Sequence, residues 1–354
     1  MKKLLAIAVA AALVAPAAAM AETTLYGKLH ASYGEVKDNA GDKVTGVESH
    51  SSRIGIKGSH ALNNGLEATY GLEYGIDLDG DNGGDAVNGR PSIGADVGSK
   101  TLSARNTFVG LKGGFGEVRV GRHDTPAKLA TAGQDVFADT YADMANIVNV
   151  DGHRVDNAVA YINKFGPVGF AVAHSTGPAG ADNSPNANSA MVNYGNGPWY
   201  AGLGYTKVDD SALEVGKVGN DNLRGDVVGT QFGKHVNLGL GWKAEAGHQV
   251  NLVLEQSKDA NGGSGKNDAY LVNGVAKFGN VALKGQYGES KNKSFALPAQ
   301  NGKEKLASVG LDYSLGKKTS VYLLHSQNKN PNRIEGEGDG YKVKSTAVGL
   351  VTEF

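Results

Sequence analysis

The sequence predicts an all-β fold, a closed barrel of sixteen antiparallel strands that crosses a membrane. Three observations carry this prediction: apolar and polar residues alternate along long segments, short and long connections alternate along the chain, and glycine is abundant. Glycine provides 52 of 354 residues, about twice its usual share of roughly 7%. Hydrophobic residues still make up 40%, which excludes a flexible linker and a disordered chain.

The alternation of apolar and polar residues is plainest over residues 66–77, where every second residue is leucine, alanine, tyrosine or isoleucine. Residues 25–33 show the same period of two. One face of each segment is therefore apolar and the other polar, as in a β-strand. The segment 66–77 is longer than the usual strand of about five or six residues. Its length suits a tilted strand that crosses a bilayer in about 9 to 11 residues.

Connections between these segments predict the number of strands. Seven short connections carry turn residues, at 62–65, 113–116, 165–167, 195–198, 246–248, 278–280 and 315–318. Eight long polar stretches alternate with them, near 37–47, 78–100, 124–152, 177–188, 209–225, 258–268, 291–304 and 329–340. Fifteen connections join sixteen strands, with both termini at the short-turn end. Residues 226–246 leave one strand or two open, and the even strand number of closed barrels favours one.

Short turns at one end and long loops at the other are typical of outer-membrane barrels, with the turns in the periplasm and the loops outside the cell. A sheet in hydrocarbon must close on itself, because the bilayer offers no partner for a free backbone N–H or C=O group. After the leader, no run of about 18 apolar residues is present, which excludes a helical membrane protein.

Residues 1–21 have the features of a secretory signal peptide. Lys2 and Lys3 precede an apolar stretch, and Ala19-Met20-Ala21 forms a small-residue cleavage site. The alternative is a membrane anchor, but the apolar run is short and Pro16 interrupts it. We therefore expect export from the cytoplasm, with residues 22–354 forming the barrel and Glu22 as the first residue of the mature chain.

Several motifs resemble one family. Residues 52–58 (Ser-Arg-Ile-Gly-Ile-Lys-Gly) and 106–122, together with Thr24-Leu25-Tyr26-Gly27 and the final Phe354, resemble the general trimeric porins of Gram-negative bacteria, especially the neisserial type. The resemblance implies a homotrimer in the lipid of the outer membrane. It also implies a third long loop, residues 124–152, that folds inward and narrows a water-filled pore for passive diffusion of small hydrophilic solutes and ions.

Charged residues of the strands are candidates for the pore lining. Five basic residues fall on the polar parity, and the resemblance adds Arg105. The six candidates are Lys28, Arg53, Lys57, Arg105, Arg119 and Arg154. The third loop supplies Asp135, Asp139 and Asp143, whose spacing of four would place them on one face of a helical turn. Opposed basic and acidic groups would create a transverse field that sorts ions. The alternative is that these charges are merely solvated on a wet inner face.

An acidic segment of the second loop has the oxygen-rich spacing of a calcium site, through Asp77, Asp79, Asp81 and Asp85. It departs from the EF-hand, because Asn82 and Asn88 stand where glycine and glutamate are expected. A solvated outer loop is the simpler interpretation, so no metal site is assigned.

Catalytic and cofactor motifs are missing from the sequence, including H-E-x-x-H, G-x-S-x-G and a phosphate loop. We therefore expect a channel without cofactor and without enzymatic activity. With 35 basic and 36 acidic residues, nucleic acid is not an expected partner, and without cysteine a disulfide scaffold is excluded. The alternatives are a substrate-specific channel, a surface adhesin, and a barrel enzyme with a Ser-His pair assembled in space. A sugar-specific channel would be expected to use an aromatic track, and only Trp199 and Trp242 are available as tryptophans.

Overall fold

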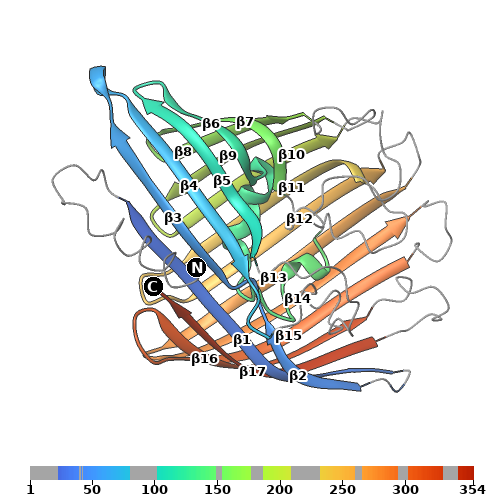
Figure 1. The fold of residues 1–354 in the computed structure, drawn as a ribbon. Coiled ribbons are helices and arrows are strands. Elements are labelled where there is room, and N and C mark those ends of the chain that lie inside the picture. Colours follow the sequence, from blue (N-terminus) through green and yellow to red (C-terminus); the bar gives the residue numbers. More distant parts are fainter. Residues whose placement is uncertain are drawn as a thin grey trace.

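The computed structural model describes residues 23–39, 41, 43–79, 102–148, 154–176, 186–208, 232–259, 265–293, 302–329 and 342–354. In these residues the chain forms one antiparallel sheet that curves into a barrel (Figure 1). None of the helices in this part of the chain is long and apolar enough to cross a bilayer.

The sheet contains seventeen strand segments. In chain order they are β1 (Thr24–Asp38), β2 (Lys43–Ser49), β3 (Arg53–Ala61), β4 (Glu67–Ile76), β5 (Leu102–Gly113), β6 (Gly116–Asp124), β7 (Arg154–Phe165), β8 (Val168–Ser175), β9 (Ala187–Asn196), β10 (Trp199–Val208), β11 (Phe232–Lys243), β12 (Gln249–Asp259), β13 (Lys266–Phe278), β14 (Val281–Lys293), β15 (Gly302–Ser314), β16 (Thr319–Lys329) and β17 (Lys342–Glu353).

Two of these segments form one spanning strand, so sixteen strands cross the barrel wall. Both β2 and β3 pair with β1, one above and one below a break at residues 50–52. At the break, Ser52 Oγ accepts a hydrogen bond from His30 N over 2.9 Å and donates one to His30 O over 3.0 Å. The side chain thus satisfies backbone groups that a continuous ladder would have paired. The antiparallel pairing of β1 with β17, from Lys28↔Glu353 to Asp38↔Val343, closes the barrel.

The two faces of the strands differ as the alternation predicts. On β12, Val250 and Leu254 are exposed on the outside, whereas Asn251 and Glu255 are buried on the inside. The outer face is apolar and the inner face polar, which is the reverse of a water-soluble β-sandwich.

All seven short connections lie where the sequence predicts them, and six of them hold or end in a glycine with positive φ, such as Gly166 and Gly197 at 56°. Three long connections are shorter than predicted. Strands β1 and β2 are joined by residues 39–42, β12 and β13 by residues 260–265, and β14 and β15 by residues 294–301. The prediction of loops over 37–47, 258–268 and 291–304 was wrong in its bounds because the polar ends of these strands were counted as loop. The described part of 226–246 holds one strand, β11.

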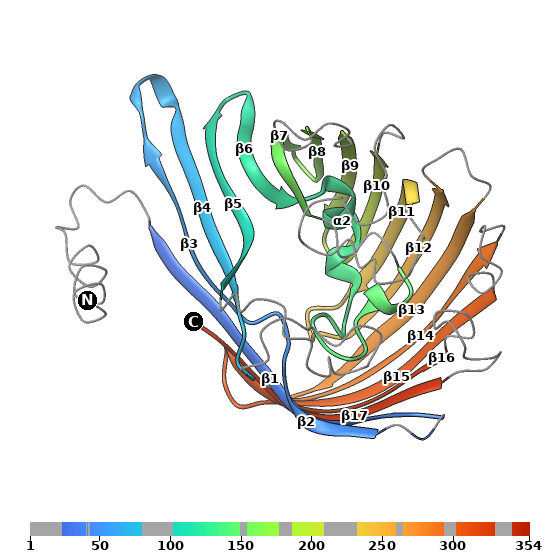
Figure 2. The ribbon, with the colours of Figure 1, turned by 45° about the vertical axis from the view of Figure 1, so that its right-hand side comes forward.

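The connection between β6 and β7 is here called loop 3 (residues 125–153), and its described part, residues 125–148, folds into the barrel (Figure 2). It contains the helix α2 (Pro126–Thr131) and the 3₁₀ turns η2 (Ala132–Gln134) and η3 (Met144–Asn146); a further turn, η1 (Asn63–Gly65), joins β3 to β4. Thr125 begins α2, because its side chain accepts a hydrogen bond from Lys128 N, and Pro126 fits the first helical position.

Candidate functional site

Helix α2 rests on β9, β10 and β11, where three glycines leave room for its backbone. A Cβ atom on Gly204 would lie 2.7 Å from Ala127 Cα, and one on Gly239 would lie 3.1 Å from Ala130 O. A Cβ atom on Gly202, which pairs with Gly239 in the sheet, would lie even closer to Ala130 O. We call these three residues the glycine seat. Any side chain larger than hydrogen there would push the loop away from the wall.

Amide and hydroxyl groups on the same wall hold the loop backbone. Asn237 Nδ2 donates to Ala127 O over 2.8 Å and to Thr131 Oγ1 over 2.9 Å. Asn273 Nδ2 donates to Gln134 O over 2.7 Å. These bonds satisfy carbonyl groups that would otherwise be buried without partners.

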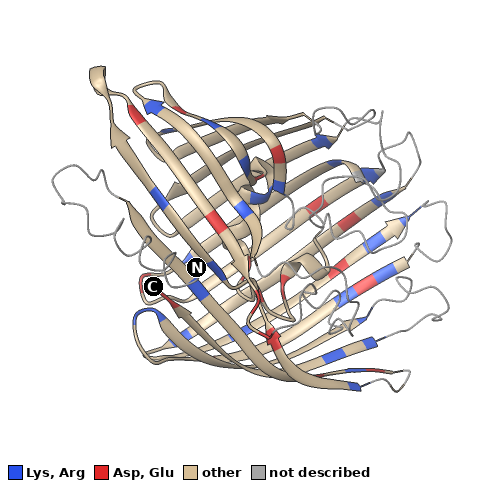
Figure 3. Cartoon of the chain, in the orientation of Figure 1, with Lys and Arg blue, Asp and Glu red and all other residues tan. Residues whose placement is uncertain are grey.

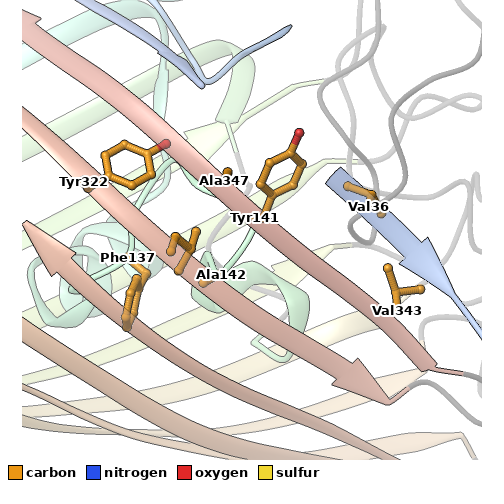
Figure 4. Close-up of a cluster of buried hydrophobic side chains, with 8 residues drawn as sticks. Val36, Phe137, Tyr141, Ala142, Tyr322, Val343 and Ala347 are labelled. Carbon is orange, nitrogen blue, oxygen red and sulfur yellow. The ribbon is translucent and has the colours of Figure 1, made fainter. Parts of the chain in front are cut away.

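Apolar contacts complete the attachment of loop 3. Figure 4 shows Phe137, Tyr141 and Ala142 of the loop near Tyr322, Val343 and Ala347 of β16 and β17. A second buried cluster joins Met144, Ile147 and Val148 to side chains of β12, β13 and β15. The inner faces of β9 to β17, here called the loop wall, therefore carry most of loop 3.

The tip of loop 3 reaches the opposite side through Asp139. Its carboxylate accepts from Lys28 Nζ over 2.7 Å and from Arg53 Nη1 over 3.2 Å, and Lys28 and Arg53 are direct partners in the sheet. Burial alone would raise the pKa of Asp139, but the charges of Lys28 and Arg53 outweigh it and hold the pKa well below the ordinary value of 3.8. Asp139 is thus an ionised link between the loop and the barrel.

A β-bulge turns Arg105 toward the barrel interior. Leu72 pairs with Thr107 and Tyr74 with Ala104, so two residues of β5 stand opposite the single residue Glu73. Arg105 Nε donates to Glu73 Oε1 over 2.8 Å. Strict alternation would place Arg105 outside, and the bulge re-aims it.

The second bulge residue, Asn106, helps to hold a further carboxylate at the start of loop 3. Asn106 Nδ2 donates to Asp124 Oδ2 over 2.7 Å. Asp124 Oδ1 lies 2.8 Å from Lys128 Nζ and 3.1 Å from Arg154 Nε. We give the name charged network to the five basic side chains and three carboxylates joined by these contacts, which are Lys28, Arg53, Arg105, Lys128 and Arg154 with Asp139, Glu73 and Asp124. The inner faces of β1 and β3 to β7, which carry most of it, are the charged wall.

Two predicted basic residues lie outside this network. Lys57 Nζ is 4.9 Å from the centre of the Tyr26 ring. Arg119 forms two hydrogen bonds with Glu117, of 2.8 and 2.9 Å, and its guanidinium lies 4.2 Å from the centre of the Phe108 ring. Both positions are nearer the short-turn end of the barrel. Lys57 lies on β3 opposite Thr24, the first residue of β1, and Arg119 lies near the start of β6, just after the short turn at 113–116.

The three loop aspartates do not share a helical face, so that part of the prediction was wrong. Asp139 has φ 58° in a turn. Asp135 accepts from the backbone N–H groups of Phe137 and Met144 over 2.8 and 2.9 Å. Asp143 accepts from those of Asp139 and Ala145 over 2.8 and 2.7 Å. Both carboxylates satisfy loop backbone donors, which spacing along the sequence could not reveal.

Sequence reasoning missed the carboxylates Glu73 and Asp124 and the loop lysine Lys128. Glu73 lies on the polar parity of its strand, and Asp124 opens the stretch predicted as loop 3, so both carried a usable signal. Lys128 follows Asp124 by four residues, a spacing at which opposite charges meet on a helical turn.

The acidic segment of the second loop is only partly described. Asp79 Oδ2 accepts from Ser49 N over 2.7 Å, so this carboxylate binds the backbone next to the break between β2 and β3. Asp81 and Asp85 lie outside the described residues. Among the residues that are described, Asp77 included, no group of three or more histidine, cysteine, aspartate or glutamate side chains is arranged to hold a metal ion.

Comparison with known proteins decides the family. The family model described as Gram-negative porin matches residues 6–333. The chain belongs to this family. It is 28% identical to the major outer membrane protein P.IB of Neisseria gonorrhoeae over 374 residues, covering 99% of this chain and 98% of the relative. It is also 28% identical to outer membrane porin protein 32 of Delftia acidovorans, covering 98% of this chain and 95% of the relative.

Solved porin structures share the fold. The anion-selective porin from Comamonas acidovorans matches with a TM-score of 0.70 and 23% identity, covering 95% of this chain and 100% of that one. Salmonella typhi OmpF matches with a TM-score of 0.68 and 17% identity, covering 94% and 98%. This porin is therefore an outer-membrane channel for passive diffusion of small hydrophilic solutes and ions, and it resembles channels rather than enzymes.

Proposed function

We propose that ions are selected between the charged wall and the tip of loop 3, and that anions pass more readily than cations. One observation carries the proposal: five basic side chains of the charged network share three carboxylates. The network therefore has two positive charges in excess. Charges that line a narrow passage attract counter-ions and repel co-ions.

The position of these charges supports the sign of the preference. Four of the basic side chains project from strands of the barrel wall, which holds them in place: Lys28, Arg53, Arg105 and Arg154. Asp139 lies on the loop, and its two ion pairs hold it in place. Charges in wide regions are screened beyond a Debye length of about 8 Å at physiological salt, so groups beside the narrowest part dominate. A Comamonas porin of the same fold is named anion-selective, and we infer the same preference here from this chain's own charges.

The test is the reversal potential of single channels in a potassium chloride gradient. We expect a sign that reports anion preference, and a shift toward cations in Arg105→Ser/Arg154→Ser. The double variant removes two positive charges from the network, and the shift should shrink as salt rises. A matched control is Lys317→Ser/Lys318→Ser, which removes the same charge from an exposed turn. Equal shifts in the two variants would show that selection occurs elsewhere.

We further propose that the porin assembles as a homotrimer. A Vibrio cholerae outer membrane protein of the same fold occurs in a trimer form, and the apolar outer face of the barrel can pack against lipid or another copy. Purified protein in mild detergent should migrate as a trimer that boiling dissociates. A monomer under the same conditions would contradict this proposal without affecting the channel.

The leader is also a proposal, because residues 1–21 lie outside the described residues. Export through a cleaved signal peptide would leave Glu22 at the N-terminus, and mass spectrometry of the outer-membrane fraction should find it there. Retention of Met1 would contradict cleavage.

A further inference from the structure

Two aromatic side chains lie on the inner face of the charged wall, where strand alternation normally places polar residues. Tyr26 extends across Gly55, its direct partner on β3, and Phe108 extends across Gly71, its direct partner on β4. A Cβ atom on Gly55 would lie 2.5 Å from Tyr26 Cζ, and one on Gly71 would lie 2.7 Å from Phe108 Cε1. The two glycines therefore let both rings lie close against the wall.

Contacts inside the barrel show that the two rings face the lumen. Tyr26 Oη donates to Glu73 Oε2 over 3.0 Å, and Glu73 also binds Arg105 on the inner face. Phe108 has the opposite parity to Val109, which is 67% exposed on the outer face. Both rings are half-exposed, so they present apolar surface to the water of the channel.

A basic side chain lies over each ring. Lys57 Nζ is 4.9 Å from the centre of the Tyr26 ring, and the guanidinium carbon of Arg119 is 4.2 Å from the centre of the Phe108 ring. The negative face of an aromatic ring attracts a cation at such a distance. We call Tyr26, Lys57, Phe108 and Arg119 the aromatic-cation patch. Its two rings lie over β3 and β4, which are neighbouring strands about 4.8 Å apart, so one small solute can touch both halves of the patch.

The carboxylates beside Lys57 do not balance its charge. Figure 3 shows blue bands on β3 and β5 and red bands on β4 between them. The carboxylates of β4 are engaged by β5, because Glu73 lies 2.8 Å from Arg105 Nε and Glu67 lies 3.4 Å from Lys112 Nζ. Lys57 is exposed and has no ion pair within the described part of the chain. Its charge is therefore offered to solutes in the lumen.

The patch lies apart from the charged network, toward the short turns. Lys57 follows Arg53 by four residues on β3, which is about 13 Å along a strand. This separation exceeds the Debye length of about 8 Å at physiological salt. The patch therefore meets solutes at a different point of the channel from the one where ions are selected.

We propose that the aromatic-cation patch binds aromatic carboxylates as they pass through the channel. The carboxylate accepts from Lys57 Nζ, which has three donors, and the ring of the solute packs against Phe108 and the guanidinium of Arg119. Arginine stacks on aromatic rings, and two hydrogen bonds from Arg119 to Glu117 hold the guanidinium in place. A small inorganic anion would use the charge without the rings, and a neutral sugar would use the rings without the charge.

The experiment measures how benzoate blocks the chloride current through single channels. Acetate has the charge without the ring, and benzamide has the ring without the charge. Benzoate should halve the current of the wild-type porin at a concentration about threefold or more below that of either control, because half-exposed cation–ring and ion-pair contacts each contribute modestly. Block by benzoate that is no stronger than block by acetate or by benzamide would overturn the proposal.

Variants of the porin test the two halves of the patch separately. Lys57→Gln removes the charge and Phe108→Leu removes a ring, so each should weaken the block by benzoate by about threefold or more. Lys57→Arg should retain the block. In Phe108→Leu, the block by acetate and the current without benzoate should match the wild type, which shows that the channel is folded.

The matched control is Lys284→Gln. Lys284 lies near the start of β14, at the same end of the barrel but on the loop wall, and it is paired with Asp312. Its loss removes the same charge from the lumen, yet the block by benzoate should equal that of the wild type. An equal loss of block in Lys284→Gln and Lys57→Gln would overturn the proposal, because any lumen lysine would then serve.

Maltose tests the other class of solute that binds aromatic rings. Block by maltose that exceeds block by benzoate and persists in Lys57→Gln would assign the patch to neutral sugars and overturn the proposal. Undiminished block by benzoate in Lys57→Gln or in Phe108→Leu would also overturn it. These measurements use block and not the reversal potential, so they are independent of the sign of ion selection.

Discussion

The charged wall and the loop wall are two halves of one barrel interior that use different residues for different purposes. The charged wall, on β1 and β3 to β7, carries lysine and arginine side chains that outnumber the carboxylates with which they form ion pairs. The loop wall, on β9 to β17, carries glycine, asparagine, serine and apolar side chains that hold loop 3 in place. The charged wall therefore supplies the electric field in the lumen, and the loop wall determines the position of loop 3.

The two walls also differ in how they depart from regular strand geometry. The charged wall has register shifts, between Leu72 and Tyr74 of β4 and between Gly121 and His123 of β6. In the described part of the loop wall the register shifts only at the long-loop end of β11, between Phe232 and Lys234, and from β12 through β17 the pairing is regular. A bulge re-aims side chains, whereas a regular sheet offers a smooth surface for a packed loop. The difference teaches that charge placement here depends on local irregularity, and loop placement on small side chains.

The largest expected effect comes from filling the glycine seat. In Gly204→Val, the new side chain would overlap Ala127, whose Cα would lie 2.7 Å from the Cβ atom. Helix α2 must move toward the lumen, so single-channel conductance should fall. The free energy of unfolding should drop by about 1–3 kcal/mol, the usual cost of overpacking. Planar-bilayer recording and denaturant unfolding would measure the two effects.

The matched control for this prediction is Gly285→Val on β14. A Cβ atom there would meet no heavy atom within 4 Å, and valine suits a strand. Its conductance should equal that of the wild type. If Gly204→Val also conducts normally, α2 does not rest on the seat as described.

A smaller effect is expected when the link between the two walls loses its charge. In Asp139→Asn, Lys28 and Arg53 lose their shared carboxylate and the network gains one unit of positive excess. A unit charge about 8 Å from a passing ion in water contributes about 0.5 kcal/mol, so anion preference should rise by about twofold. The reversal potential at low salt measures this change.

Asp143→Asn is the comparison for Asp139→Asn, because it removes the same charge from the same loop. Asp143 binds backbone N–H groups within the loop and has no ion pair with the charged network among the described residues. Its reversal potential should move less than that of Asp139→Asn. Equal shifts in reversal potential would mean that any negative charge on loop 3 affects ion selection equally. The ion pairs of Asp139 at the tip would then have no particular part in selection.

Most of the fold could be predicted from sequence, because membrane-spanning strands obey a strong constraint. Alternation must hold wherever one face meets lipid and the other meets water, and turns need particular residues, so the seven short turns and the sixteen strands were predictable. The ends of strands were not. Lys37 and Lys43 are polar and were counted as loop, yet they lie in β1 and β2, beyond the region where hydrocarbon imposes alternation.

The candidate site was predictable only in part, because it depends on contacts between distant segments. Parity indicates that Lys28 and Arg53 face inward, but it cannot show that Asp139 is their partner. Arg105 violates parity through a bulge, and resemblance to a family, not periodicity, singled it out. The glycine seat was visible only as an excess of glycine, since its purpose requires the path of loop 3.

The smallest expected effect is that of mild acid on the link between the walls. The pKa of Asp139 is below its ordinary value of 3.8 because Lys28 and Arg53 outweigh the effect of burial, so Asp139 keeps its charge between pH 7 and pH 5. A carboxylate with a depressed folded-state pKa stabilises the fold above its unfolded pKa, and this contribution is lost as the pH falls through the folded value. Other groups titrate too, so the useful quantity is the difference in reversal potential between wild type and Asp139→Asn. That difference should stay constant from pH 7 to pH 5 and close only below pH 4. If it closes near pH 5, Asp139 is not paired with Lys28 and Arg53 in the open channel, and the two walls are not linked at that point.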